Sequence, residues 1–264
     1  MSHVFRLLDT GFHDAFYNMG LDQTLLEGAG GESLPCLRFY GWKPRAVSIG
    51  YFQGLDEEVN VFSCGERGVD VVRRLTGGGA VFHNAELTYS LILSLDHPLA
   101  RRSIQESYRI LCAGIVRGLK NFGLDASFVP INDIEYKGKK ISGNAQTRKN
   151  GALLQHGTVL LDNDPELMFE LLKVVPEKAG ARPPVAGVKQ RVSSLSEILG
   201  REVPYGEALA AISRGFGEAL DIEFTGTPGN PSEKARLPSP DEEERALYLA
   251  KNRFADSLWT GARP

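Results

Sequence analysis

The chain has 264 residues, a length that allows one large domain or two small ones. Hydrophobic residues form 42% of the sequence and charged residues 24%, the balance of an ordinary globular protein. The formal net charge is only −3, so there is no polycationic field and we expect no nucleic-acid partner. The sequence shows neither a signal peptide nor an apolar run that could span a membrane, which predicts a cytoplasmic protein without membrane contact.

Hydrophobic periodicity and turn residues predict a chain in which short strands and helices are interspersed. In chain order the predicted elements are helix 14–27, strands 37–40 and 46–51, a helix opened by the acidic run 56–58, strands 69–72 and 87–93, helix 103–122, successive hairpins over 131–162, a helix from Asp164–Pro165, and helices 191–200, 205–220 and 241–256. Ser103 and Glu106 have the spacing of a capping box, which makes helix 103–122 the clearest of these elements.

The order of these elements lacks the regular strand–helix–strand rhythm of a doubly wound sheet, and it favours an α+β fold. Two prolines at 183 and 184 predict a loop before the short helix 191–200. Four prolines within 226–240 predict a connector that leads to the last helix, 241–256.

A run of three glycines, Gly77 to Gly79, follows the apolar run 69–72 and two arginines, Arg73 and Arg74. Consecutive glycines allow positive φ angles and let a ligand approach backbone N–H groups, as phosphate or carboxylate oxygens require. A guanidinium is a natural partner for the same anions. The plain alternative is a glycine-rich hairpin turn without a ligand.

A second group of candidates lies between 132 and 158. Lys140 directly precedes the small residues of Ile141–Ala145, so its ammonium could reach a phosphate or a carbonyl oxygen that gains negative charge. We interpret its neighbours Lys137, Lys139 and Lys149 as solvated hairpin residues.

Three other residues carry two interpretations each. His83 and His156 are either ligand contacts or hydrogen-bonded structural residues. Asp133, after Asn132, offers a carboxylate to a magnesium ion or simply begins a turn.

The spaced motifs resemble those of the lipoate–protein ligase and octanoyltransferase family. Arg73–His83 matches its motif Arg-Arg-x-Ser/Thr-Gly-Gly-Gly-Ala-Val-Phe/Tyr-His, and Gly138–Ala145 matches its lysine motif, with Asn144 where serine is commoner. His156–Thr158 matches its His-Gly-Thr. The resemblance covers nearly the whole chain, so it implies a single catalytic domain over 1–264. The implied fold is a mixed or antiparallel sheet flanked by helices, as in biotin ligases and class II aminoacyl-tRNA synthetases.

The resemblance also implies roles for the glycine motif. Arg74 and the backbone of Gly78, Gly79 and Ala80 would cradle the phosphate and acyl carbonyl of lipoyl-AMP. The apolar side chains of Val81 and Phe82 would line a tunnel for the acyl chain, and His83 at the end of the motif would be a further binding residue.

In the second group, the resemblance makes Lys140 the catalytic residue that stabilises charge on the carbonyl and phosphate oxygens. Asn144 would touch the nucleotide, His156 would contact the ligand, and Asp133 would lie near Mg²⁺ and the phosphates. Implied substrates are lipoate, ATP with Mg²⁺, and a lysine of an acceptor lipoyl-domain protein.

The choice between the two branches of the family depends on cysteine. Several flanking blocks look like the octanoyltransferase branch, which carries octanoyl from acyl carrier protein on a cysteine thioester. The chain has only Cys36, Cys64 and Cys112; Cys112 falls on the predicted core helix and Cys64 on a predicted surface helix, so we interpret both as structural. We therefore predict an ATP-dependent ligase, with an octanoyltransferase or a non-catalytic binder of lipoyl domains as alternatives. No accessory domain is recognisable, so a separate small subunit is a possible partner.

Overall fold

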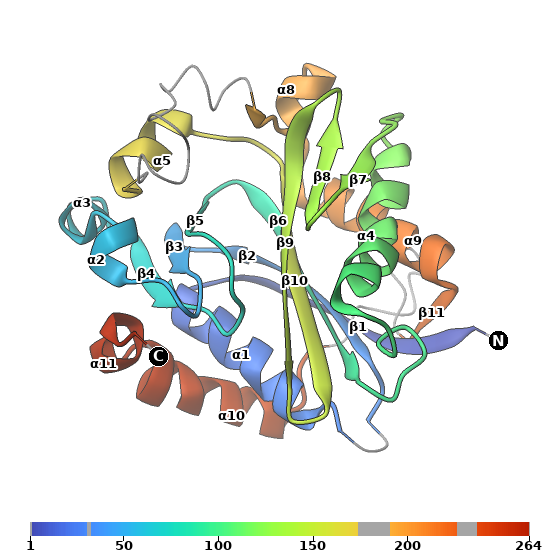
Figure 1. Ribbon diagram of the computed structural model, residues 1–264, viewed down its shortest axis with the longest axis horizontal. Helices are drawn as coiled ribbons and strands as arrows, with labels where there is room; N and C mark the ends of the chain where they lie inside the picture. Colours follow the sequence, from blue (N-terminus) through green and yellow to red (C-terminus); the bar gives the residue numbers. More distant parts are fainter. Residues whose placement is uncertain (1, 31–32, 174–190, 226–236, 264) are drawn as a thin grey trace.

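The computed structural model describes residues 2–30, 33–173, 191–225 and 237–263. Its centre is a mixed eight-stranded sheet in the order β11-β1-β2-β6-β10-β9-β8-β7 (Figure 1). The strands are β1 (His3–His13), β2 (Cys36–Trp42), β6 (Glu86–Ser94), β7 (Ser127–Val129), β8 (Asp133–Tyr136), β9 (Lys139–Lys149), β10 (Ala152–Leu160) and β11 (Ile222–Thr225). β1 runs parallel to β2 and to β11, and the other neighbouring pairs are antiparallel.

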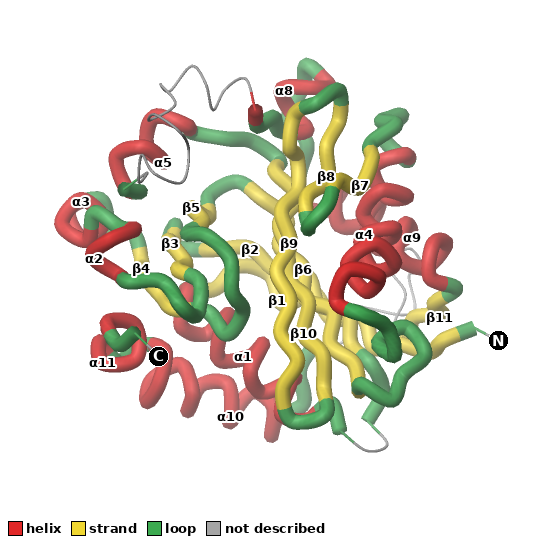
Figure 2. Tube along the Cα trace, in the orientation of Figure 1, coloured by secondary structure: helices red, strands yellow, loops and turns green. Residues whose placement is uncertain are grey.

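A separate three-stranded sheet has the order β4-β3-β5, with β3 (Ala46–Ile49) between β4 (Asp70–Arg73) and β5 (Val81–His83). The glycine run connects β4 to β5. Figure 2 shows this small sheet beside the middle of the large one, with loops between them.

Helices cover both faces of the large sheet (Figure 1). Their bounds are α1 (Ala15–Gly28), α2 (Leu55–Glu58), α3 (Val61–Glu66), α4 (Ile104–Lys120), α5 (Pro165–Leu171), α8 (Leu195–Leu199), α9 (Tyr205–Leu220), α10 (Pro240–Leu249) and α11 (Ser257–Gly261), with a π-helical turn η1 (Ala250–Phe254) after α10. The largest core lies between the sheet and the α4–α9 pair, and a second core lies between the sheet and α1. The predicted α+β class, with a mixed sheet flanked by helices, is confirmed.

Local signals account for the helix starts that the sequence predicted. The Ser103 hydroxyl accepts from Glu106 N–H at 3.3 Å while the Glu106 carboxylate accepts from Ser103 N–H, so the capping box is formed. Asp164 caps α5 through the N–H of Leu167 at 3.0 Å, and Pro165 occupies the first turn.

Other elements differ from the prediction. The sequence interpretation did not anticipate β1, β5, β7 or β11. The helix expected over 241–256 is formed by α10 and the π-helical turn η1, and it ends at Phe254. Asp256 then accepts from Leu258 N–H at 2.9 Å and begins the separate short helix α11, which was not predicted. The acidic run 56–58 fills a single turn, α2. The loop at 183–184 and most of the connector 226–240 lie outside the described residues.

Candidate active site

A cavity of about 310 Å³ lies between the small sheet and strands β9 and β10. Its lining includes residues from both sequence motifs: Arg74, Gly78, Gly79, Ala80, Val81, Phe82 and His83 from the first, and Lys140, Asn144 and His156 from the second. Asp133 is the one predicted site residue outside the lining, and it reaches the cavity through Lys140. The fold therefore brings together two segments that are about sixty residues apart.

The glycine loop needs its glycines for two different reasons. Gly78 has φ +96°, a conformation that L-residues with a side chain rarely adopt. Gly50, directly after β3, packs closely against the loop, and an added Cβ there would collide with the carbonyl oxygen of Gly78. The sequence interpretation missed Gly50, although a glycine inside the predicted strand 46–51 was a visible sign of close backbone approach.

Arg74 lies behind the glycine loop, and its N–H groups are already bonded within the protein. Nη2 donates to the carbonyl oxygens of Gly77 and Gly79 at 2.7 and 2.8 Å. Nε donates to the Thr76 hydroxyl, and Nη1 donates to the carbonyl and hydroxyl oxygens of Ser48. Burial lowers the pKa of the guanidinium to about 10. Arg74 therefore holds the glycine loop in its conformation. It has no free N–H for the direct phosphate contact that the sequence predicted.

Arg73 points away from the cavity, so its expected role beside a ligand is wrong. Its side chain is fully buried, and burial lowers its pKa. The guanidinium donates to five backbone carbonyls, those of Gly50, Tyr51, Gln53, Trp259 and Thr260. Arg73 thus joins the loop after β3 to the helix α11.

Lys140, at the start of β9, extends its side chain along the cavity. Its Nζ lies 2.7 Å from Asp133 Oδ1, and the two side chains are 39% and 31% exposed. Gly143 leaves room for this side chain, because an added Cβ would stand 2.8 Å from Lys140 Cε and Nζ. A partly solvated ammonium at a cavity wall is suited to stabilise a developing anion.

Asn144 is held from three sides. Its Oδ1 accepts from the Tyr89 hydroxyl at 2.7 Å, and its Nδ2 donates to the carbonyl of Asn132 at 2.8 Å. The Asn132 amide in turn donates to the Asn144 carbonyl. Gly157 is required opposite, since a Cβ there would collide with Asn144 Oδ1. Asn144 therefore presents a fixed amide to the cavity.

His83 and His156 line the cavity, but both rings are almost completely buried. His83 bonds to Ser48 and Glu86, and His156 bonds to Thr76 and Asp22. Every ring nitrogen thus has a protein partner, which supports the structural interpretation of both residues over direct ligand contact.

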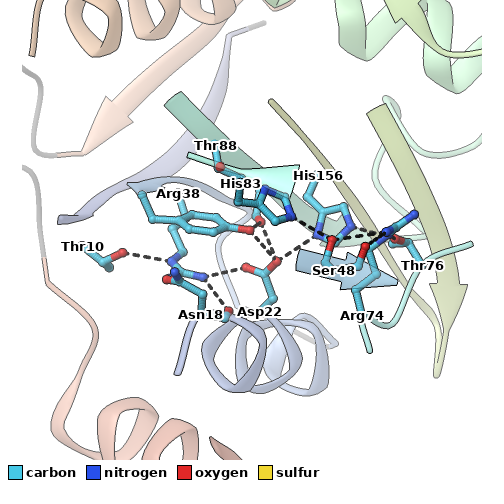
Figure 3. Close-up of polar contacts among 12 residues, drawn as sticks. Thr10, Asn18, Asp22, Arg38, Ser48, Arg74, Thr76, His83, Thr88 and His156 are labelled. Atoms are coloured by element: carbon cyan, nitrogen blue, oxygen red, sulfur yellow. Dashed lines mark hydrogen bonds and ion pairs between the residues drawn. The ribbon is translucent and has the colours of Figure 1, made fainter. Parts of the chain in front are cut away.

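A buried ion pair underlies this part of the sheet, and the sequence interpretation missed it. Arg38 on β2 and Asp22 on α1 are 2.8 Å apart and essentially inaccessible to solvent. Figure 3 shows Asp22 between Arg38 and His156. Although burial alone would raise the pKa of Asp22, the hydrogen bond from His156 and the charge of Arg38 lower it. The available signal was a charged residue inside an apolar strand and another inside an apolar helix.

Asp133 is the candidate magnesium ligand. Among the described residues, no group of three or more His, Cys, Asp or Glu side chains could hold a metal ion. Magnesium that arrives with a nucleotide needs only one or two protein carboxylates, because phosphates and water supply its other ligands. A lone Asp133 at the cavity edge fits that type of donor set, and it remains a prediction.

All three cysteines are buried and lie outside the lining of the cavity. Burial raises the pKa of Cys36 and Cys112 to about 12 and that of Cys64 to about 11. Cys64 lies on the surface helix α3, as expected, but its side chain is on the inner face and packs among Val59, Val69 and Leu171. A thiol with such a pKa is hardly ionised at neutral pH, and the thiolate is the nucleophile.

A mixed sheet that brings a glycine loop and a lysine to one cavity gives a site with the donors that an anionic or acyl substrate requires. The model of the lipoyl protein ligase A/B catalytic domain matches residues 14–217. The chain belongs to this family. No helix of the described ranges is long and apolar enough to cross a membrane.

Two curated relatives are octanoyltransferases named LipM. The protein from Brevibacillus brevis is 36% identical, over 92% of this chain and 93% of its own length. The protein from Bacillus subtilis is 33% identical, over 98% and 99%. These names favour the octanoyltransferase alternative over the ATP-dependent ligase that the sequence interpretation preferred.

Among solved structures, the chain is similar to lipoate–protein ligases. The bi-partite ligase of Thermoplasma acidophilum superposes with a TM-score of 0.83 at 29% identity, covering 99% of this chain and 97% of that one. Lipoate-protein ligase A bound with ATP superposes with a TM-score of 0.80 at 28% identity, covering 99% of both chains.

Proposed function

We propose that the chain acylates a lysine of a lipoyl-domain protein and that it makes its acyl donor from lipoate and ATP. The observation that carries the choice of donor is the state of the cysteines. A thioester route needs an accessible thiolate, and all three thiols are buried with raised pKa values. An acyl adenylate needs only donors for its oxygens, and the cavity offers them.

In the first half-reaction the lipoate carboxylate attacks the α-phosphorus of ATP, and pyrophosphate leaves. N–H groups of the glycine loop and the Lys140 ammonium offset the charge on the phosphate and carboxyl oxygens. Val81 and Phe82 would face the acyl chain. Magnesium bound to the nucleotide would neutralise phosphate charge, with Asp133 as its protein ligand.

In the second half-reaction a neutral lysine amine of the lipoyl domain attacks the acyl carbonyl. The carbon–oxygen bond to AMP breaks, AMP leaves with the electron pair, and the amine loses a proton as the amide forms. Lys140 again stabilises the oxyanion. The lysine of the acceptor is therefore a substrate, distinct from Lys140.

The second candidate is an octanoyltransferase that takes octanoyl from acyl carrier protein. The names of the curated relatives favour it. It would use the same acyl pocket and the same Lys140. Without an accessible thiol among the three cysteines, the acceptor lysine would have to attack the carrier thioester directly.

One pair of reactions separates the candidates. The purified chain is mixed with Mg²⁺, ATP and lipoate without an acceptor, and mass spectrometry is used to find lipoyl-AMP. In parallel, octanoyl-acyl carrier protein and a lipoyl domain are supplied without ATP, and octanoylation of the domain is measured. The adenylate with no octanoylation supports the ligase; the reverse result replaces it by the transferase.

The neighbour described as bi-partite suggests a control for a missing partner. If both reactions fail, lipoyl-AMP prepared chemically is supplied together with the lipoyl domain. Transfer from this adenylate would mean that a separate subunit completes the activation step. A cytoplasmic location, where lipoyl domains and ATP would be available, is part of the same proposal.

A further inference from the structure

Two buried chains of hydrogen-bonded polar groups, called relays below, end at the guanidinium of Arg74. In the first, Asp22 Oδ2 lies 3.1 Å from His156 Nδ1, and His156 Nε2 lies 2.7 Å from the Thr76 hydroxyl. Arg74 Nε donates to that hydroxyl at 3.1 Å. Figure 3 shows this series running from Asp22 to Arg74.

The second chain has the same chemistry but comes from other elements. Glu86 Oε1 lies 2.7 Å from His83 Nδ1, and His83 Nε2 lies 2.7 Å from the Ser48 hydroxyl. Arg74 Nη1 donates to that hydroxyl at 3.2 Å. Trp42 stacks on the His83 ring with centroids 3.9 Å apart, which fixes the ring plane.

The hydroxyls determine which nitrogen of each ring carries the proton. Ser48 and Thr76 each accept from Arg74 and have one proton of their own to donate. If each donates to a histidine Nε2, then Nδ1–H donates to the carboxylate, and both hydroxyls and all four ring nitrogens are satisfied, while Glu86 Oε2 has no hydrogen-bond partner. Protonation of Nε2 would leave each hydroxyl proton without this acceptor, at a cost in a buried site.

We propose that His83 and His156 are positioning residues, which act together through Ser48 and Thr76 to hold Arg74 against the glycine loop. Arg74 keeps two N–H groups for the Gly77 and Gly79 carbonyls, so those carbonyls turn away from the cavity and the loop stays open to a ligand. The inference rests on the proposed function, because it assumes that this loop receives the acyl donor. It assigns neither histidine a contact with substrate.

The first test reads the ring nitrogens directly and needs no turnover. Histidine labelled with ¹⁵N gives two-bond ¹⁵N–¹H correlations that distinguish the tautomers, and H83Q and H156Q identify the signals. In the native protein we expect both rings to carry a proton on Nδ1 and none on Nε2, since Nε2 accepts from the hydroxyl. A proton on Nε2 of either ring overturns the relay at that residue, whatever the protein's activity.

The second test removes one hydroxyl and keeps the shape of the side chain. Thr76→Val should lower kcat/KM for acyl transfer about 10- to 100-fold, because a displaced loop misplaces the donor, and Thr76→Ser should restore most of the rate. Each variant is assayed with the donor that the native enzyme accepts, and its fold is checked by circular dichroism. Native rates in Thr76→Val, or no recovery in Thr76→Ser, overturn the proposal.

The third measurement tests whether both relays act through Arg74. Because both relays end at Arg74, the loss in Thr76→Val combined with Ser48→Ala should be smaller than the product of the two single losses. A loss equal to the product of the two single losses would mean that the hydroxyls act independently, and it would overturn the proposal that both act through Arg74. If Thr76→Val does not fold, Ser48→Ala with Ser48→Thr as the rescue provides the same comparison. If the native protein uses neither donor, the proposed function fails, while the tautomers still decide the relay.

Discussion

Lys140 and Asp133 meet because strand β9 contains a bulge. Asp133 is paired with Gly143 and Ile134 with Ser142, but Glu135 is then paired with Lys140, so Ile141 is an extra residue. Side chains alternate between the faces of a strand, and Lys140 would otherwise point to the face opposite Gly143. The bulge turns it over Gly143, where its Nζ lies 2.7 Å from Asp133 Oδ1.

This geometry gives Lys140 a position that its neighbour Lys139 does not share. Lys140→Ala should reduce acyl transfer by at least about 100-fold, as does the loss of a charge-stabilising donor in other enzymes. The side chains of Lys140 and Asp133 are both partly exposed, so this substitution should change the free energy of unfolding by no more than about 0.5 kcal/mol. Rates and urea unfolding of the purified variants check both parts.

Lys139→Ala is the matched control, because Lys139 pairs with Glu197 at 3.2 Å and does not line the cavity. It should keep the native rate. Equal loss in the two variants, or none in Lys140→Ala, would contradict the role given to Lys140.

The buried thiols predict resistance to alkylation. Iodoacetamide at pH 8 should leave the activity of the native protein unchanged, because thiols with a pKa near 11 or 12 are hardly ionised there. Variants with Cys36, Cys64 or Cys112 replaced by alanine should retain the native rate and lose about 1 kcal/mol of stability each.

A covalent intermediate would show itself in the same experiment. After incubation with octanoyl-acyl carrier protein, the intact mass of the native chain should be unchanged. An octanoyl adduct that disappears in one of the three alanine variants would establish a thioester route and remove the ligase proposal.

Gly50 has a support role that can be tested separately from chemistry. Gly50→Ala would push a Cβ into the Gly78 carbonyl, and because this neighbour is backbone, the glycine loop must shift. We expect a loss of about 1–3 kcal/mol of stability, as for other overpacked sites, together with weaker acyl transfer.

Gly206→Ala gives the comparison for Gly50. This glycine lies in the first turn of α9, and an added Cβ would meet no atom within 4 Å. Alanine should leave the rate unchanged and raise stability by up to about 1 kcal/mol through helix propensity. Equal behaviour of the two variants in thermal unfolding and activity would remove Gly50 from the loop's support.

The buried pair of Asp22 and Arg38 makes a prediction about stability. Asp22→Asn would leave the Arg38 charge buried without its counter-charge, which costs about 3–5 kcal/mol. Asp96→Asn removes a carboxylate from an exposed pair with Arg101 and should cost less than about 1 kcal/mol. Urea unfolding measures both, and similar losses would mean that the buried pair is not a special source of stability.

Sequence patterns predicted what depends on near neighbours in the chain. The capping box at Ser103, the cap at Asp164 and the positive φ at Gly78 each involve residues within a few positions of one another. Motif resemblance added the partnership of the glycine run with Lys140, which the cavity contains.

What the sequence did not disclose depends on distant pairing. Nothing near Arg73 and Arg74 indicates that one guanidinium would join α11 and the other would brace the loop. The bulge at Ile141 follows from the register between β8 and β9, which one strand does not encode. For the same reason β1 and β11, each defined by strands far away in the chain, were missed.

A partly buried histidine far from the cavity predicts how stability depends on pH. Burial lowers the pKa of His97 from 6.5 to about 4, and the nearby His3 adds to this effect. Between these pH values the unfolded chain binds a proton that the folded chain does not, so stability is complete above pH 6.5 and falls as the pH decreases toward 4. The full difference would be worth about 3 kcal/mol, and solvent screening of a partly exposed ring leaves about 1 kcal/mol.

His97→Asn keeps an acceptor for the Leu99 N–H but does not titrate in this range, so it should flatten that part of the profile. Urea unfolding at pH 4.5 and pH 7 of both proteins measures the difference, and an equal slope for the two would assign the pH dependence to other groups.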